Sequence, residues 1–153
     1  MRAMAHTFTN LLFHIIFSTK DRVPHLDAAL RPRLLAYMGG IVRELDATAV
    51  CVNGPADHVH LLIAAPPKLA VSDLLRVLKT NSSRWVHAEF PRHAGFAWQT
   101  GYGAFSVSHS NADAVRHYIL NQEEHHRTVT FQEEYIAFLT RHGIAYDERY
   151  IWE

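Results

Sequence analysis

The feature that most constrains the fold is the order in which strand-like and helix-like spacings of apolar residues follow one another along the chain. A period-two run over residues 13–17, with apolar side chains on both faces, predicts a central strand. Apolar residues at helical spacing then predict a helix over residues 30–46. Two further strands, over residues 48–52 and 58–64, are joined by an Asn-Gly-Pro turn, so we expect them to pair antiparallel.

The next segment repeats this alternation. A second helix, with Leu74 and Leu78 on its inner face, should end at Pro91, and residues 105–109 predict a fourth strand. Strand, helix, strand, strand, helix, strand is the order of the ferredoxin-like βαββαβ fold, an α+β class with an antiparallel sheet. Right-handed crossovers would place both helices on one sheet face, leave the other face free, and put the third strand beside the first.

Two capping patterns predict additional C-terminal helices. Ser110 with Asp113 would start one near residue 111 that continues to about residue 126, and Thr130 with Glu133 would start another that ends at Gly143. The length of 153 residues suits one domain. We therefore expect a single domain over residues 1–153, with a core at about 8–110, a helix at about 111–126, and a C-terminal helix and tail at about 130–153.

Composition narrows the cellular setting. A single cysteine, Cys51, excludes an internal disulfide, and no secretory leader pattern is present at the start. The longest strongly apolar run, residues 61–65, is far below the roughly 20 residues of a membrane span. We expect a cytoplasmic protein with no membrane partner.

The overall charge does not favour a nucleic-acid partner, because 15 basic and 15 acidic residues cancel. Local charge is different. Residues 68–92 carry five basic and two acidic side chains, so this segment could meet phosphates, although a solvated helix face is an equally simple interpretation.

A histidine pair on the third predicted strand carries the first chemical signal. Side chains two apart on a strand point the same way, so His58 and His60 would share one face and could bind one cation. The pair alone is weak evidence, because 12 histidines in 153 residues make an accidental His-x-His expected about once. Two ordinary strand histidines remain an alternative.

The second signal is a tyrosine and a glutamine on the third predicted helix. Tyr118 and Gln122 are four residues apart, so a helix would bring the phenol and the amide to one face. A half-buried tyrosine beside an exposed glutamine is the simpler interpretation of this pattern alone.

Together the two patterns suggest a reaction at phosphorus. A phenol needs about 3 to 4 kcal/mol to lose its proton at neutral pH, and a nearby divalent cation can supply part of that. His58, His60 and Gln122 would be neutral ligands that leave positions open for a phosphate oxygen and water, as Mg²⁺ or Mn²⁺ requires. A structural zinc site, which wants a closed four-ligand shell, is less favoured because Cys51 is the only thiol.

These residues resemble the single-tyrosine transposases of insertion-sequence-200/605 elements. His58-Val59-His60 is similar to that family's His-hydrophobe-His (HUH) metal motif, and Tyr118 with Gln122 is similar to its Tyr-x-x-x-Gln helix. The similarity covers nearly the whole chain and includes residues 12–20, 57–63, 78–85 and 98–108. Asp57, where Glu is more usual, is a departure that touches no proposed ligand.

The resemblance implies a metal-dependent transposase that cuts single-stranded DNA at element ends and rejoins it through a 5′-phosphotyrosine intermediate. Tyr118 would be the nucleophile, and His58, His60 and Gln122 would hold Mg²⁺ or Mn²⁺. It also implies a homodimer in which the tyrosine helix of one subunit can complete the metal site of the other, and a DNA partner with hairpin ends.

Further contacts are predicted with less support from the pattern. Tyr102 and Trp98 could stack on bases, although core or dimer packing is the favoured interpretation. His14 would either support the metal site or simply be packed. For phosphate contacts we expect the basic residues Lys20, Arg22, Lys79 and Arg84.

Alternative functions remain open. One is a domesticated relative that binds hairpin DNA without transposition, although the intact Tyr118 and Gln122 favour cleavage. A second is a rolling-circle-type nicking enzyme or relaxase, which usually has a third histidine and a larger chain, so the short length and Gln122 favour the transposase. A third is a ferredoxin-like regulator or RNA-binding module whose histidine pair is incidental, which the lack of the aromatic RNA-binding signature weakens.

Overall fold

A four-stranded antiparallel sheet forms the centre of the computed structural model, which describes residues 6–126 and 128–153. Its strands are β1 (Leu11–Ser18), β2 (Thr48–Asn53), β3 (His58–Ala65) and β4 (Gly103–Val107). The spatial order is β2-β3-β1-β4, so β3 lies beside β1 as expected. The α+β architecture with additional C-terminal helices is confirmed.

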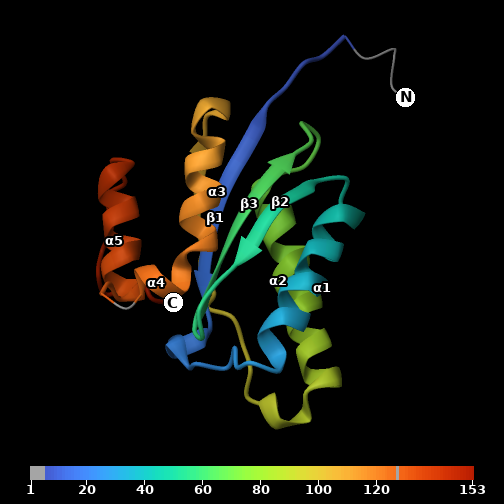
Figure 1. Cartoon of the computed structure of the whole chain (residues 1–153), viewed down its shortest axis with the longest axis vertical. Helices are drawn as coiled ribbons and strands as arrows, with labels where there is room; N and C mark the ends of the chain where they lie inside the picture. The colour runs from blue at the N-terminus through green and yellow to red at the C-terminus, as the bar shows by residue number, and fades with distance from the viewer. Residues whose placement is uncertain (1–5, 127) are drawn as a thin grey trace.

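Two helices cover one face of the sheet, α1 (Leu30–Glu44) and α2 (Val71–Glu89) (Figure 1). Alternate side chains of the central strands point to this face, among them Ile15 and Phe17 of β1 and Leu61 of β3, all fully buried. They form the larger hydrophobic core. The opposite set of side chains on the same strands therefore faces away from α1 and α2.

That opposite face is not free, which corrects the expectation from the sequence. The helices α3 (Ala112–Leu120), α4 (Gln122–His125) and α5 (Phe131–Arg141) lie against it (Figure 1). Ile16 and Phe105 of the sheet pack against Phe131, Tyr135 and Phe138 of α5. The apolar stripe of α5 needs a surface to cover, and this face of the sheet supplies it.

Of the two N-terminal caps predicted for the C-terminal helices, one forms and one does not. Thr130 and Glu133 form the expected reciprocal capping box at the start of α5. Ser110 does not cap α3, because Asn111 is the residue at the N-cap and no side chain caps the helix there. The Ser110 hydroxyl instead lies 3.1 Å from that of Ser108.

The segment expected as one helix over residues 111–126 forms two helices. The break is at Asn121, whose backbone angles of φ −100° and ψ 25° are not helical. Its side chain bonds the ring of His117 instead, at 2.8 Å. Tyr118 and Gln122 therefore belong to different helices, α3 and α4.

Three short 3₁₀ turns complete the described elements, η1 (Lys20–Arg22), η2 (Pro91–His93) and η3 (His109–Asn111). Within residues 6–126 and 128–153, no helix has both the length and the apolar character needed to cross a bilayer.

Candidate active site

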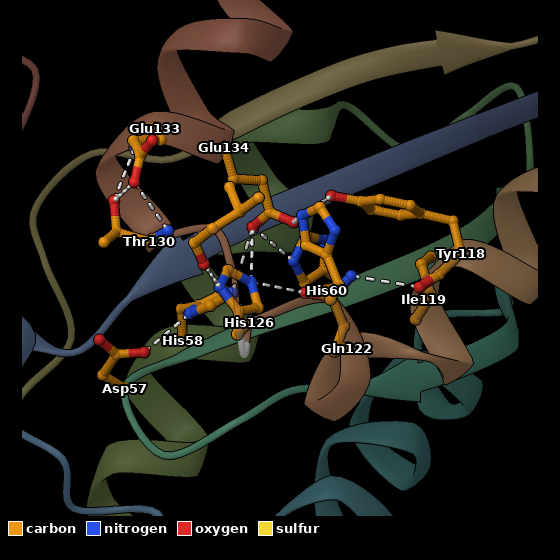
Figure 2. Close-up of polar contacts among 12 residues, drawn as sticks. Asp57, His58, His60, Tyr118, Ile119, Gln122, His126, Thr130, Glu133 and Glu134 are labelled. Carbon is orange, nitrogen blue, oxygen red and sulfur yellow. Dashed lines mark hydrogen bonds and ion pairs between the residues drawn. The ribbon is translucent and has the colours of Figure 1, made fainter.

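The predicted histidine pair lies on the sheet face that α3, α4 and α5 cover. His60 of β3 is paired with Ile16 of β1, and His58 is paired with Ser18. Both imidazoles are fully buried and point to the same side, as the spacing predicts. The central strands therefore hold the two rings in fixed positions under the C-terminal helices (Figure 2).

The pair meets a carboxylate and a third imidazole that sequence reasoning missed. Glu134 Oε1 lies 3.2 Å from His58 Nε2, 3.1 Å from His60 Nε2 and 3.2 Å from His126 Nε2. One ligand atom from each of these four side chains lies within 4.8 Å of all the others. A signal for Glu134 did exist, because it is an acidic residue on the apolar stripe of its helix, between Phe131 and Phe138.

Hydrogen bonds on the far side of the rings fix where the protons lie. The Nδ1–H of His58 donates to Asp57 Oδ1 at 2.8 Å, and the Nδ1–H of His126 donates to the Val129 carbonyl at 2.6 Å. His60 Nδ1 lies 2.8 Å from His14 Nε2. His14 is therefore a partner of the pair, and all three Nε2 atoms face the cluster.

Burial and charge act in opposite directions on these groups. Burial lowers the pKa of His60 to about 4, despite the nearby Glu134 carboxylate. Burial alone would lower the pKa of His58, but its contacts with Asp57 and Glu134 raise it. Burial alone would raise the pKa of Glu134, but hydrogen bonds from His126, His58 and His60 hold it well below its usual range. The cluster therefore contains a buried negative charge that needs a cationic partner.

The buried groups fit a divalent ion. His58 Nε2 is buried and has no hydrogen-bond partner among the described residues, although Glu134 Oε1 lies 3.2 Å away. An imidazole that donates from Nδ1 to a carboxylate and leaves Nε2 free is the usual arrangement of a metal-binding histidine. Protons on the Nε2 atoms are the alternative cation when no ion is bound.

Tyr118 reaches the cluster from α3 within the same chain. Its hydroxyl donates to Glu134 Oε2, the carboxylate oxygen that does not face the histidine pair, and lies 3.1 Å from His125 Nε2. Burial raises the pKa of Tyr118 above its ordinary value, and the Glu134 hydrogen bond and charge raise it further. The phenol is therefore protonated in this state. A cavity of about 260 Å³ beside it, which also touches His14 and Arg141, leaves one side of the ring accessible.

Gln122 lies at the edge of the cluster. Its side chain is fully buried, its Oε1 lies 2.9 Å from His126 Nε2, and its Nε2 donates to the Tyr118 carbonyl at 3.2 Å. The amide oxygen thus faces the third imidazole. Its role as a metal ligand stays a prediction.

The residues predicted to bind DNA lie in three different places. Lys20 and Arg22 line a cavity of about 290 Å³ with Trp152, over whose ring the Arg22 guanidinium lies at 5.5 Å. Arg84 is exposed on α2, which covers the sheet face opposite the histidine pair. Trp98 is packed in the core, where its Nε1–H donates to Ser82, so the packing interpretation of that residue is confirmed.

Lys79 is engaged with a loop. Its ammonium donates to the carbonyls of Gln99, Thr100 and Gly101 at 2.9, 3.2 and 2.6 Å. Burial lowers the pKa of Lys79 to about 8. Since an ammonium has three protons, all of them are directed at this loop. Contact between Lys79 and DNA stays a prediction.

Replacing Lys79 with methionine should therefore destabilise the fold. The change keeps the aliphatic stem but leaves three loop carbonyls without their donor, which should cost about 1.5 to 3 kcal/mol in the free energy of unfolding. Urea denaturation would measure it. Lys68→Met is the matched control, because Lys68 makes an exposed ion pair with Asp46, whose loss should cost less than about 1 kcal/mol. Equal losses in both variants would contradict this role.

Comparison with known proteins adds family information. Residues 7–122 match the family model described as transposase, IS200 like. The chain is 30% identical over 133 residues to the transposase for insertion sequence element IS200 of Salmonella typhimurium, covering 80% of this chain and 84% of that protein. It is 26% identical over 119 residues to the ISDra2 transposase TnpA of Deinococcus radiodurans, covering 74% and 85%.

Solved structures agree with the fold. A crystal structure of a proposed transposase from Deinococcus radiodurans superposes with a TM-score of 0.65 at 28% identity, covering 80% of this chain and 98% of the other. A REP-associated tyrosine transposase bound to a REP hairpin superposes with a TM-score of 0.53 at 13% identity, covering 78% and 68%. The second likeness shows the fold alone. The family match includes Tyr118 and Gln122 but ends before His126 and Glu134.

Proposed function

Because the chain belongs to the IS200-like transposase family, we propose that it cuts and rejoins single-stranded DNA at element ends through a 5′-phosphotyrosine intermediate. Tyr118 is the nucleophile, and His58, His60 and Gln122 hold a divalent ion, Mg²⁺ or Mn²⁺. One observation carries the proposal: the Tyr118 hydroxyl and the histidine pair share a single carboxylate, Glu134 (Figure 2).

The reaction follows from the placement of these atoms. The Tyr118 oxygen attacks a phosphodiester phosphorus, which forms the phosphotyrosine bond and releases a 3′-hydroxyl. Glu134 Oε2 already accepts the hydrogen bond from that phenol and is placed to receive its proton. A bound ion would supply Lewis-acid stabilisation of the phosphate and the phenolate. The released 3′-hydroxyl then attacks a second phosphotyrosine, which forms a new phosphodiester, breaks the phosphorus–tyrosine bond and returns a proton to that phenol, so the bond energy is kept for rejoining.

The DNA partner and the assembly belong to the same proposal. We propose that hairpins at the element ends are bound, which is consistent with the hairpin held by the REP-associated transposase of similar fold. We also propose that Lys20, Arg22, Lys79 and Arg84 contact DNA phosphates from the three places in which they lie. We also propose a homodimer. The cis contact between Tyr118 and Glu134 means that a partner subunit is not needed to bring the phenol to the histidine pair.

Covalent capture tests this function. The full chain is incubated with labelled single-stranded DNA from the flanks of its gene, in Mg²⁺ or Mn²⁺, and denatured. A labelled protein band is expected, with the nucleotide on the peptide that contains Tyr118. The same sequence as a duplex is the control and should give no band. Absence of any adduct, or an adduct on another residue, would contradict the proposal. Transfer of the label to a second DNA end separates a transposase from an enzyme that only nicks.

A further inference from the structure

We infer that His126 and Glu134 are direct metal ligands together with His58 and His60, and that this centre is built for a first-row transition ion of the Mn²⁺ or Zn²⁺ kind. The inference rests on the proposed function only for what the ion does. The ligand set expected from the sequence was three neutral side chains, those of His58, His60 and Gln122. The inferred set is instead buried and consists of three imidazoles and one carboxylate.

The first argument is convergence on one point. Three Nε2 atoms, from His58, His60 and His126, lie 3.1 to 3.2 Å from the same oxygen, Glu134 Oε1. With Glu134 included, the four side chains come from three separate segments: β3, the C-cap of α4, and α5. Glu134 is 3% exposed, and His58 and His60 are fully buried. Water therefore does not solvate these polar groups, and their burial costs free energy unless a partner compensates for it.

The second argument is the direction of the lone pairs. The Nδ1 atoms of His58 and His126 each donate to an acceptor, Asp57 and the Val129 carbonyl, so in their neutral form both rings present Nε2 lone pairs to the cluster. Glu134 Oε1 is also an acceptor. Acceptors that face one another repel unless a cation lies between them. The unpartnered Nε2 of His58 is the clearest case.

The third argument identifies the class of ion. Mg²⁺ prefers oxygen ligands in an octahedron and keeps several waters, so three imidazoles suit it poorly. Imidazole with a carboxylate suits zinc and other first-row transition ions. His126 and Glu134 bring the protein ligands to four, and a first-row ion can expand to a fifth position for a phosphate oxygen. The Gln122 oxygen, 2.9 Å from His126 Nε2, is next to this shell and can join a higher coordination number.

Glu134 also connects the ion to the nucleophile. Its Oε1 faces the imidazoles while its Oε2 accepts the Tyr118 hydroxyl. A ligand that holds both fixes the phenol at a set position relative to the ion. Loss of Glu134 should therefore reduce ion affinity even when no DNA is present.

Ion binding to the chelator-treated full chain tests the ligand set without DNA. Calorimetric titration should show one Zn²⁺ or Mn²⁺ per chain and at least about tenfold weaker Mg²⁺ binding. His126→Asn and Glu134→Gln should each weaken Zn²⁺ binding beyond the roughly 10-fold to 100-fold cost of losing an outer partner. His125→Asn is the matched control, because the adjacent His125 contacts Glu134 Oε2 and not Oε1. Equal Mg²⁺ and Zn²⁺ affinity, or unchanged Zn²⁺ affinity in both variants, would overturn the inference.

A measurement on the unmodified chain covers the case in which a variant does not fold. X-ray absorption of the Zn²⁺-loaded protein should count three imidazoles and one carboxylate around the metal. A count of two imidazoles would overturn the inference even if covalent DNA adducts form. A count of three imidazoles in a protein that forms no DNA adduct would support the ligand set and contradict the proposed function. Failure of the inference and failure of the proposed function are therefore distinguishable.

Discussion

Replacing Tyr118 with phenylalanine is expected to abolish the covalent protein–DNA adduct and strand transfer, down to the background of a reaction without enzyme. The change removes one oxygen, the proposed nucleophile, and keeps the ring that packs beside His14 and Phe138. The fold and ion binding should therefore persist. Denaturing gels with labelled DNA measure the adduct, and calorimetry measures the ion.

Tyr135→Phe is the matched control for that variant. Tyr135 is a buried tyrosine on α5 that packs with Phe131 and Trp152, so its hydroxyl is not placed to attack DNA at the cluster. Its adduct yield should stay at the wild-type level. A strong adduct from Tyr118→Phe would remove the basis of the assignment.

Mixing two inactive variants tests whether the site is shared between subunits. Tyr118→Phe keeps the histidine pair, and His60→Ala keeps the nucleophile. If each site uses one chain, as the cis contact of Tyr118 with Glu134 suggests, the mixture should remain inactive. If the tyrosine helix of one subunit completes the other's site, activity should return on mixing.

The parts of the site that the sequence predicts are those set by local geometry. Strand alternation places His58 and His60 on one face, and the structure agrees because β3 is regular and central. The four-residue spacing of Tyr118 and Gln122 was expected to act through one continuous helix. The non-helical backbone angles of Asn121 break that helix, and no simple period signals such a break.

The two residues of the cluster that the sequence did not predict, His126 and Glu134, depend on contacts between distant segments. His126 and Glu134 reach the strand histidines only because α4 and α5 fold back over the sheet. Because the sheet face opposite α1 and α2 was expected to be free, this arrangement was not predicted. Phe131, Tyr135 and Phe138 lie at helical spacing and form the apolar stripe of α5, but periodicity does not say which surface a stripe covers.

Acid is expected to destabilise the ion-free protein strongly, because His14 and His60 are buried as neutral rings. Burial, followed by the neighbouring His60, lowers the pKa of His14 from 6.5 to about 3, and burial lowers that of His60 to about 4. The unfolded chain binds more protons at these sites below pH 6.5, so stability falls as the pH falls from 6.5 towards 4. Each group can contribute up to about 1.4 kcal/mol per pH unit.

Two other groups in the cluster set the limits of that window. The pKa of His58 is raised by its contacts with Asp57 and Glu134 despite burial, so its stabilising contribution is complete below pH 6.5 and does not offset the loss there. The pKa of Glu134 is lowered from 4.5, so its contribution is lost only below pH 4.5. Within the cluster, the loss between pH 6.5 and 4.5 should therefore come from His14 and His60, with a combined slope of up to about 3 kcal/mol per pH unit.

His14→Gln separates the two histidines. The glutamine oxygen can still accept a hydrogen bond from His60 Nδ1, but the side chain no longer titrates, so the slope of unfolding free energy against pH should fall by about half. Urea denaturation of chelator-treated protein at several values between pH 6.5 and 4.5 measures the slope. His109→Gln, which alters an exposed histidine, is the control and should keep the wild-type slope. If the His14→Gln slope matches that of His109→Gln, then His14 is not the buried neutral partner of His60 that the 2.8 Å contact between their rings implies.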